Sequence, residues 1–273
     1  MLYRTLKLDV RDDVAALTLN RPEKRNAISP EMMEDLQAAL SEVESGAARV
    51  AIVTGAGKDF CAGMDLGGLK SIAAAKKEVE VHTGPSAGAA DPSVENARLV
   101  AAMFRRFYEF PKPLVAAVNG HAVAGGCGLA MLCDFTLAAP GAKFGFTEVR
   151  VGFMPALIAA FVLRQLSEKS ARDLLLSGRV FGAEEARELG LVSEIVPAER
   201  LMDRAWEMAA QFLALSPTSV RYTKQLIADF TRSQLDRELE TGIKWSSRIR
   251  STADFREGLS AFLEKRAPRW TGR

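Results

Sequence analysis

The chain is poor in the residues that carry metal and disulfide chemistry. Its 273 residues include only two histidines, His82 and His121, and three cysteines, Cys61, Cys127 and Cys133. So few histidines exclude a metal site built from several of them, and we expect no metal. The cysteines are odd in number and form no CxxC pair, so we expect reduced, buried thiols in a cytoplasmic protein.

Long apolar runs and a charge of one sign are also missing. No window approaches the ~18 consecutive apolar residues of a membrane span. The first stretch, "MLYRTLKLDVRDDVAAL", lacks the apolar core of a signal peptide, so no membrane association is expected. The 36 basic and 34 acidic residues give a net charge of +2, which argues against nucleic-acid binding.

Strands and helices are predicted to alternate over the first two thirds of the chain. A turn at residues 11–13 separates two short strands, and Ser29-Pro30 has the form of a helix start. Buried strands are predicted at 49–55 and in "PLVAAV". Further helices are predicted at 94–110, 155–166, 168–177 and 183–189, and further strands in "DFTLAAP", "AKFGFTE" and "LVSEIV".

From Pro197 onward the pattern predicts helices alone. Their starts are expected near Pro197, Pro217, Ser233 and Thr252. This order indicates an α/β core over residues 1–196, followed by a helical region over residues 197–273. The stretch from Ser71 to Ser93 is rich in Gly, Ala, Ser and Pro, and is interpreted as a loop rather than a domain boundary.

Two segments share one design. "VAIVTGAGKDFCAGMDL" and "VAAVNGHAVAGGCGLAM" each run from a buried strand through a loop to a glycine-containing helix start. The first N–H groups of a helix have no partner within it, and glycine lets another molecule approach them. Two such ends side by side would form an oxyanion hole for a carbonyl oxygen. The simpler alternative is that these glycines only permit tight packing.

A donor pair without an obvious nucleophile favours enolate chemistry, which needs a base. Glu148, in "KFGFTEVRVGFMP", has apolar neighbours that would desolvate its carboxyl group and raise its pKa toward the useful range. The alternative, a surface glutamate paired with Arg150, is about equally favoured by the residues alone. No GxGxxG, GxxxxGK[ST] or GxSxG motif is present.

Five stretches carry a resemblance to a known family: "FCAGMDL", "AAVNGHAVAGGCGLAMLCDF", "FGFTEVRVG", "AEEARELGLVSEIVP" and "AFLEKRAP". Their order and spacing resemble those of the crotonase superfamily of enoyl-CoA hydratases and isomerases. The chain resembles this family over nearly its whole length. The resemblance implies a crotonase-like α/β spiral of repeated ββα units, with two roughly perpendicular sheets and a helical C-terminal region that mediates trimer formation.

The resemblance also implies a substrate and site residues. The implied substrate is an acyl-CoA thioester. Coenzyme A is part of this substrate, and no separate cofactor is expected. The implied assembly is a homotrimer or hexamer. Met64 and Gly125 match the residues whose N–H groups form the oxyanion hole, and Glu148 matches an acid/base. Positions that match coenzyme A contacts are Lys24, Ala27, Cys61, Ala62, Asp65, Leu66, Phe262 and Lys265.

One departure concerns a catalytic carboxylate. Family hydratases typically carry two glutamates, and Gly128 stands where the first is expected. With Glu148 alone, a 1,3-proton shift is less demanding than the addition of water, although hydration is not excluded. We also expect Gly128 to leave extra room for a branched or aromatic acyl group. The apolar "PALIAAFVLRQL" replaces a glycine-rich family segment, and is expected to reshape the acyl pocket.

The residues leave several alternatives open. Decarboxylation or C–C cleavage of an acyl-CoA could use the same scaffold, and so could a non-catalytic CoA-binding member of the family. His121 lies just before the glycines, where it could approach the thioester. A lone loop histidine is more often a structural group with a satisfied hydrogen bond, and this interpretation is favoured.

Overall fold

The computed structural model describes residues 3–67 and 91–273, so most of the predicted 71–93 loop lies outside the described residues. The strands are β1 (Leu6–Arg11), β2 (Val14–Leu19), β3 (Val50–Gly55), β4 (Leu114–Val118), β5 (His121–Val123), β6 (Phe135–Ala138), β7 (Lys143–Gly145), β8 (Phe181–Gly182) and β9 (Glu194–Ile195). The α-helices are α1 (Pro30–Ser45), α3 (Pro92–Tyr108), α4 (Gly125–Met131), α5 (Ala159–Gln165), α6 (Glu168–Ser177), α7 (Ala183–Glu188), α8 (Leu201–Leu213), α9 (Pro217–Ile249) and α10 (Ala253–Leu263). Short 3-10 turns are η1 (Pro22–Lys24), η2 (Glu148–Val151) and η3 (Ala198–Arg200).

The described strands form two sheets. The larger has the order β1-β2-β3-β4-β6-β9, in which only the β1–β2 pair is antiparallel. The smaller has the order β5-β7-β8. The predicted β1–β2 hairpin is present: Asp12 (φ 49°) and Asp13 (φ 58°) both adopt the left-handed conformation that a type I′ hairpin turn requires.

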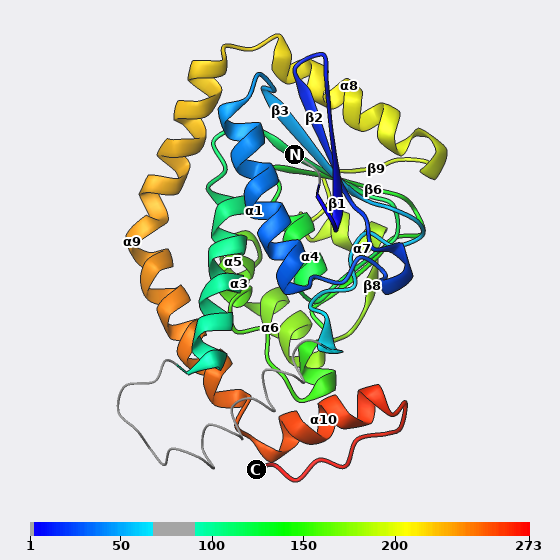
Figure 1. Cartoon of the computed structure of the whole chain (residues 1–273), viewed down its shortest axis with the longest axis vertical. Helices are drawn as coiled ribbons and strands as arrows, with labels where there is room; N and C mark the ends of the chain where they lie inside the picture. Colours follow the sequence, from blue (N-terminus) through cyan, green and yellow to red (C-terminus); the bar gives the residue numbers. More distant parts are fainter. Residues whose placement is uncertain (1–2, 68–90) are drawn as a thin grey trace.

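Side chains of the larger sheet alternate between two cores. In β3, Val50 and Ile52 face α8, whereas Ala51 and Val53 face the core beneath α1 and α3. This is the two-residue period of a strand that is buried on both faces. Figure 1 shows α1 and α8 on opposite sides of β2 and β3.

Helix starts agree with the sequence where a cap and a proline coincide. Ser29 accepts a hydrogen bond from the N–H of Met32 at 3.2 Å, and α1 begins at Pro30. Ser216 caps α9 in the same way, before Pro217, whereas Thr252 caps α10 without a following proline. The predicted start near Ser233 is wrong, because α9 continues through it to Ile249, packed along α3 (Figure 1).

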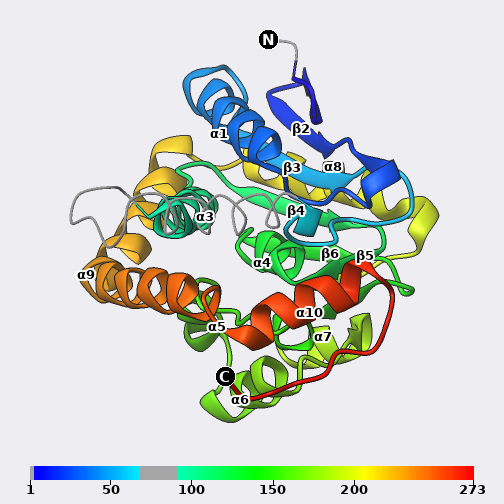
Figure 2. The same cartoon turned by 60° about the horizontal axis from the view of Figure 1, so that its bottom comes forward.

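The predicted helix 155–166 begins later than expected. Residues 156–158 form a turn, and α5 starts at Ala159. The C-terminal region is helical, as predicted, from α8 through α10. Figure 2 brings α10 to the front of the molecule, where it packs on η2. The division of the chain at residue 196 stays a prediction.

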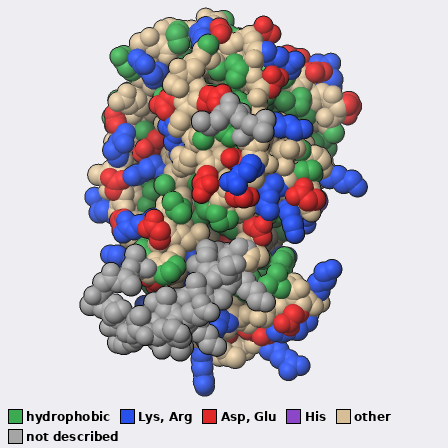
Figure 3. All heavy atoms as spheres, in the orientation of Figure 1, with side chains coloured by type: hydrophobic (Ala, Val, Ile, Leu, Met, Phe, Trp, Pro, Cys, Tyr) green, Lys and Arg blue, Asp and Glu red, His purple; other side chains and the backbone are tan. Residues whose placement is uncertain are grey.

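The surface carries both signs of charge. On the face shown in Figure 3, lysine and arginine side chains are interspersed with aspartate and glutamate over the upper part of the molecule. This agrees with the small net charge of +2. Among the described residues, no helix is long and apolar enough to cross a membrane.

Candidate active site

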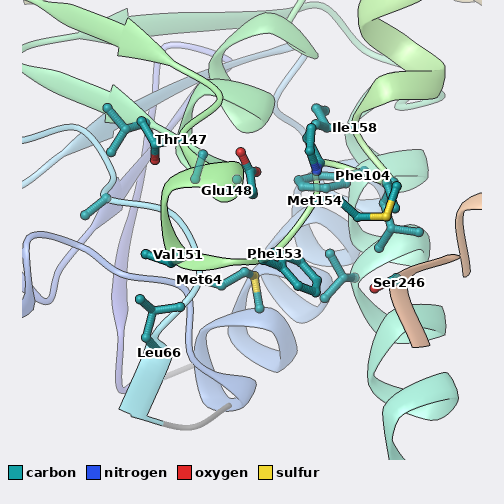
Figure 4. Close-up of a pocket in the computed structure, with 18 of the residues that line it drawn as sticks. Met64, Leu66, Phe104, Thr147, Glu148, Val151, Phe153, Met154, Ile158 and Ser246 are labelled. Carbon is teal, nitrogen blue, oxygen red and sulfur yellow. The ribbon is translucent and has the colours of Figure 1, made fainter. Parts of the chain in front are cut away.

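The candidate site is a cavity of about 230 Å³ where loops from the core meet the C-terminal helices. Met64 and Gly125 line it, together with Glu148. Apolar side chains make most of the wall, including Phe104, Val151, Phe153, Met154 and Ile158 (Figure 4). Three residues that lie far apart in the sequence and were each predicted to be functional therefore share one cavity.

Two backbone segments meet at the cavity wall. Gly63 has a φ of +84°, and a β-carbon placed on it would lie 3.1 Å from the nitrogen of Gly125. Next to Gly63, Met64 forms an isolated parallel bridge with Ile28. The bridge uses the carbonyl of Gly63 and the N–H of Asp65, which leaves the N–H of Met64 outside it. Within the described chain, neither Met64 nor Gly125 donates a backbone hydrogen bond.

The turn before α4 is held in an unusual conformation. Ala124 has φ 50° and ψ −127°, and its N–H donates to the carbonyl of Gly145 at 2.7 Å. A non-glycine residue in this region stores strain of about 1–3 kcal/mol. This turn leads directly into Gly125, the first residue of α4. Gly126 is a packing position instead, because a β-carbon there would lie 2.2 Å from the carbonyl of Cys61.

Glu148 is the first residue of η2, directly after the loop that follows β7. Its Oε2 is buried and has no hydrogen-bond partner among the described residues. Burial raises the pKa of this carboxyl to about 7, an effect that a hydrogen bond from its own backbone N–H partly opposes. Arg150 is exposed and forms no bond with it. The surface-pair alternative is therefore wrong, and Glu148 has the ionisation of a group that can gain or lose a proton near neutral pH.

The space beside Gly128 is occupied. A β-carbon on Gly128 would lie 2.8 Å from Cδ1 of Ile158 and 3.3 Å from Cε1 of Phe104. The expectation of extra acyl room at Gly128 is wrong, because Ile158 fills that space and itself lines the cavity. The late start of α5 explains this, since the turn at 156–158 carries Ile158 inward.

The predicted coenzyme A contacts divide into two groups. Ala62, Leu66 and Phe262 line the cavity, and Phe262 is 56% exposed at its edge. The others do not line it: Lys24 and Lys265 are exposed, Ala27 is half-buried, Asp65 pairs with Arg21 at 3.1 Å, and Cys61 is fully buried. Burial raises the pKa of the Cys61 thiol to about 12, and Cys127 and Cys133 are buried as well.

His121 has a structural partner. Its Nδ1 lies 3.0 Å from Oδ1 of Asp59, which also pairs with Arg25 at 2.9 Å. The Arg25 guanidinium holds the pKa of the Asp59 carboxyl below its usual range. His121 does not line the cavity, whereas Arg25 does. The favoured structural interpretation of His121 agrees with this geometry, and Arg25 is a site residue that the sequence did not reveal.

Two further polar residues in the cavity wall were missed. Ser246 on α9 and Arg250 at its C-terminal end are four residues apart, so they share one helix face. The four-residue spacing of Ser246 and Arg250 is visible in the sequence. However, we predicted that a new helix starts near Ser233, and nothing in that prediction placed this helix face at the site. In the described part of the chain, no group of three or more His, Cys, Asp or Glu side chains is arranged to hold a metal ion.

The fold and the cavity define a class: an α/β protein of the crotonase fold, with an acidic group and free backbone N–H groups around one apolar cavity. A sequence profile described as enoyl-CoA hydratase/isomerase matches residues 9–273. The chain belongs to this enoyl-CoA hydratase/isomerase family, within the crotonase superfamily.

Relatives cover the whole chain. A putative enoyl-CoA hydratase of Thermus thermophilus is 39% identical, over 94% of this chain and 97% of the relative. The 1,2-epoxyphenylacetyl-CoA isomerase of Escherichia coli is 34% identical, over 97% of each chain. The crystal structure of an enoyl-CoA hydratase from Mycobacterium avium superposes with a TM-score of 0.83 at 32% identity, covering 99% of this chain and all of that one.

Proposed function

We propose that the protein is an enzyme that moves the double bond of an enoyl-CoA thioester. The N–H groups of Met64 and Gly125 hold the thioester oxygen, and Glu148 transfers the proton. The carboxylate of Glu148 takes a proton from C2 of a 3-enoyl thioester, and the electrons of the C–H bond delocalise onto the oxygen as an enolate. Glu148 then returns the proton to C4, so that the double bond lies between C2 and C3 and no atom is gained or lost.

One observation carries the choice of isomerisation: the place of a second carboxylate is filled by hydrocarbon. Ile158 lies where a side chain on Gly128 would begin, and Phe104 lies beside it. A water molecule on that side would have no carboxylate partner and would face an apolar wall. A proton shift needs only the one base that Glu148 supplies.

Hydration is the second candidate, and Thr147 supports it. Thr147 lines the cavity beside Glu148 (Figure 4), where its hydroxyl could be the second partner of an attacking water. Names of both kinds occur among the relatives, one of which is called an isomerase and another a hydratase. The two candidates differ in whether an oxygen atom from water enters the product.

Incubation with 2-enoyl and 3-enoyl thioesters in water enriched in heavy oxygen separates these reactions. Isomerisation predicts that the two enoyl isomers interconvert without label, as read by mass spectrometry. A labelled 3-hydroxyacyl product overturns the isomerase-only proposal in favour of hydration. Loss of CO2 or chain cleavage would point to the other crotonase reactions, and tight binding without any turnover would point to a non-catalytic CoA-binding role.

We also propose that the protein works in the cytoplasm as a homotrimer or a hexamer, with no cofactor besides the coenzyme A of its substrate. Exposed apolar side chains support an assembly, because α9 presents Tyr222, Leu226, Ile227 and Phe230, each more than half exposed. Light scattering coupled to gel filtration checks this: a monomeric mass at micromolar concentration contradicts it.

A further inference from the structure

Ser246 and Arg250 are polar residues in a wall that is otherwise mostly apolar. Figure 4 shows Ser246 on the opposite side of the cavity from Thr147, with Phe153 between them. Both Ser246 and Arg250 line the cavity, and they lie on consecutive turns at the end of α9. We call these two residues and the wall around them the Ser246 end of the cavity.

Both side chains are buried and incompletely bonded. Ser246 is 1% exposed, and its Oγ has no partner among the described residues. Arg250 is 9% exposed; its Nη1 donates to the carbonyl of Ser93 at 3.4 Å, and its Nε has no partner within the described chain. Buried polar atoms are nearly always bonded, so two such donors in the wall of one cavity are placed to donate to a ligand group.

The surroundings of Arg250 favour an anion as the ligand group that accepts these hydrogen bonds. Its guanidinium carbon lies 5.4 Å from the centre of the Phe153 ring, within the apolar wall. Burial lowers the pKa of Arg250 to about 10, and the Asp91 carboxylate opposes only part of this. A buried guanidinium gains most from a carboxylate, whose two oxygens match its planar donors. A serine hydroxyl beside it adds a third donor.

We propose that Ser246 and Arg250 form a subsite for a carboxylate at the far end of the acyl chain, so that the substrates are thioesters of dicarboxylic acids. This subsite proposal rests on the proposed function in one respect only, namely that the ligand is an acyl-CoA. The thioester lies between Met64, Gly125 and Glu148, and the apolar chain passes Phe153 and Met154. The terminal carboxylate then reaches the Ser246 end.

Binding of saturated thioesters tests the subsite without requiring any reaction. Adipoyl-CoA and hexanoyl-CoA are equally long and differ only in the terminal carboxylate, and the same pairs can be made from four to eight carbons. Calorimetry should find that, at one chain length, the dicarboxylyl member binds about 10- to 100-fold more tightly. The proposal is overturned if no dicarboxylyl thioester binds more tightly than its monocarboxylyl partner at any length.

Variants then assign the preference to the named residues. Arg250→Met should remove most of the preference while changing the affinity for hexanoyl-CoA less than about threefold, and Ser246→Ala should remove a smaller part. The matched control is Arg248→Met, which removes the same charge from an exposed position on α9. Equal losses for both thioesters in Arg250→Met would show a merely structural role, and an unchanged preference would also overturn the proposal. If Arg250→Met fails to fold, Arg250→Lys and Ser246→Ala carry the same comparison.

The two proposals fail in distinguishable ways. If the dicarboxylyl preference is found but Glu148→Gln leaves turnover of every enoyl-CoA intact, the subsite stands and the proposed chemistry is wrong. If enoyl-CoA isomerisation depends on Glu148 but the binding preference is absent, the chemistry stands and the subsite is wrong. Failure of every acyl-CoA to bind overturns both.

Discussion

Gly128 and Ile158 compete for one space. A β-carbon on Gly128 would lie 2.8 Å from Cδ1 of Ile158, closer than real β-carbon contacts. Gly128 on α4 has no side chain, and the side chain of Ile158, from the turn before α5, occupies the space beside it. The position at which we predict that a carboxylate is absent is therefore filled by hydrocarbon.

This relationship predicts that a glutamate is not accommodated by a single change. Gly128→Glu should lower the free energy of unfolding by about 2 kcal/mol or more, because it both overpacks the site and buries a carboxyl group. Adding Ile158→Ala should recover at least about 1 kcal/mol of that loss. Urea unfolding of the three variants measures both effects. Gly141→Glu is the control, because nothing lies within 4 Å of that position, and its effect should stay within about 0.5 kcal/mol. Equal stability of Gly128→Glu and the unchanged protein would contradict the shared-space account.

The same pair predicts a change in reaction. In the double variant Gly128→Glu/Ile158→Ala, a second carboxylate faces Glu148 across space freed from hydrocarbon. We expect the incorporation of heavy oxygen from water into a 3-hydroxyacyl product to rise relative to isomerisation. The single variant Ile158→Ala is the control, because it opens the space without adding a carboxylate. The same product ratio in both variants would count against our interpretation of Gly128.

Glu148 predicts the pH dependence of turnover. Its pKa of about 7 means that the carboxylate form, which accepts the proton, is lost as the pH falls below neutrality. We expect kcat/KM to rise with pH and level off above about pH 7, with one ionisation. Glu148→Gln should lower kcat by about 10²- to 10⁴-fold, and remove this step from the profile. Glu23→Gln, a change at an exposed glutamate of η1, should leave both unchanged. If kcat/KM does not change between pH 5 and pH 9, Glu148 is not the acid/base.

Glu148 also predicts how stability depends on pH. Its folded-state pKa of about 7 lies above the ordinary value of 4.5, so between these values the folded state holds a proton that the unfolded state has lost. The contribution of Glu148 to stability is therefore complete below pH 4.5 and falls until pH 7. Glu148→Gln should match the unchanged protein near pH 4.5 and exceed it by up to about 3 kcal/mol at pH 8. Urea unfolding from pH 4.5 to pH 8 measures the difference in free energy of unfolding between the variant and the unchanged protein. A difference that becomes less favourable to the variant as the pH rises would contradict this prediction.

Local patterns explain which parts of the fold could be predicted. The β1–β2 hairpin, the caps at Ser29 and Thr252, and the buried strand β3 each depend on a few adjacent residues, and each was predicted correctly. The extent of α9 was not. A serine at 233 is a good cap only if the backbone is extended there, and packing of α9 along α3 keeps it helical instead.

The site was predictable only where one segment carried the signal. Glu148 and Gly125 stand in distinctive local settings, and the structure places both in the cavity with Met64. Ile158 lies in the apolar segment that was expected to reshape the acyl pocket, but its contact with Gly128 was not predicted, and Arg250 was missed. Their roles depend on which side chains of distant elements meet, and no short-range pattern encodes the contact between Ile158 and Gly128.

Gly63 tests the backbone geometry of the proposed oxyanion hole, with Gly190 as its matched control. Both glycines have positive φ, +84° and +81°, so alanine at either position costs about 1 kcal/mol of backbone strain. Only at Gly63 would the new β-carbon press on the other segment, 2.8 Å from Cβ of Ala124 and 3.1 Å from the nitrogen of Gly125, whereas nothing lies within 4 Å of Gly190. Gly63→Ala should therefore separate the N–H groups of Met64 and Gly125 and lower kcat by about 10²-fold or more.

Gly190→Ala should lose similar backbone stability and keep its activity. Steady-state kinetics, with urea unfolding of both variants, makes the comparison. Equal activity in the two variants would show that the approach of Gly63 to Gly125 serves packing alone.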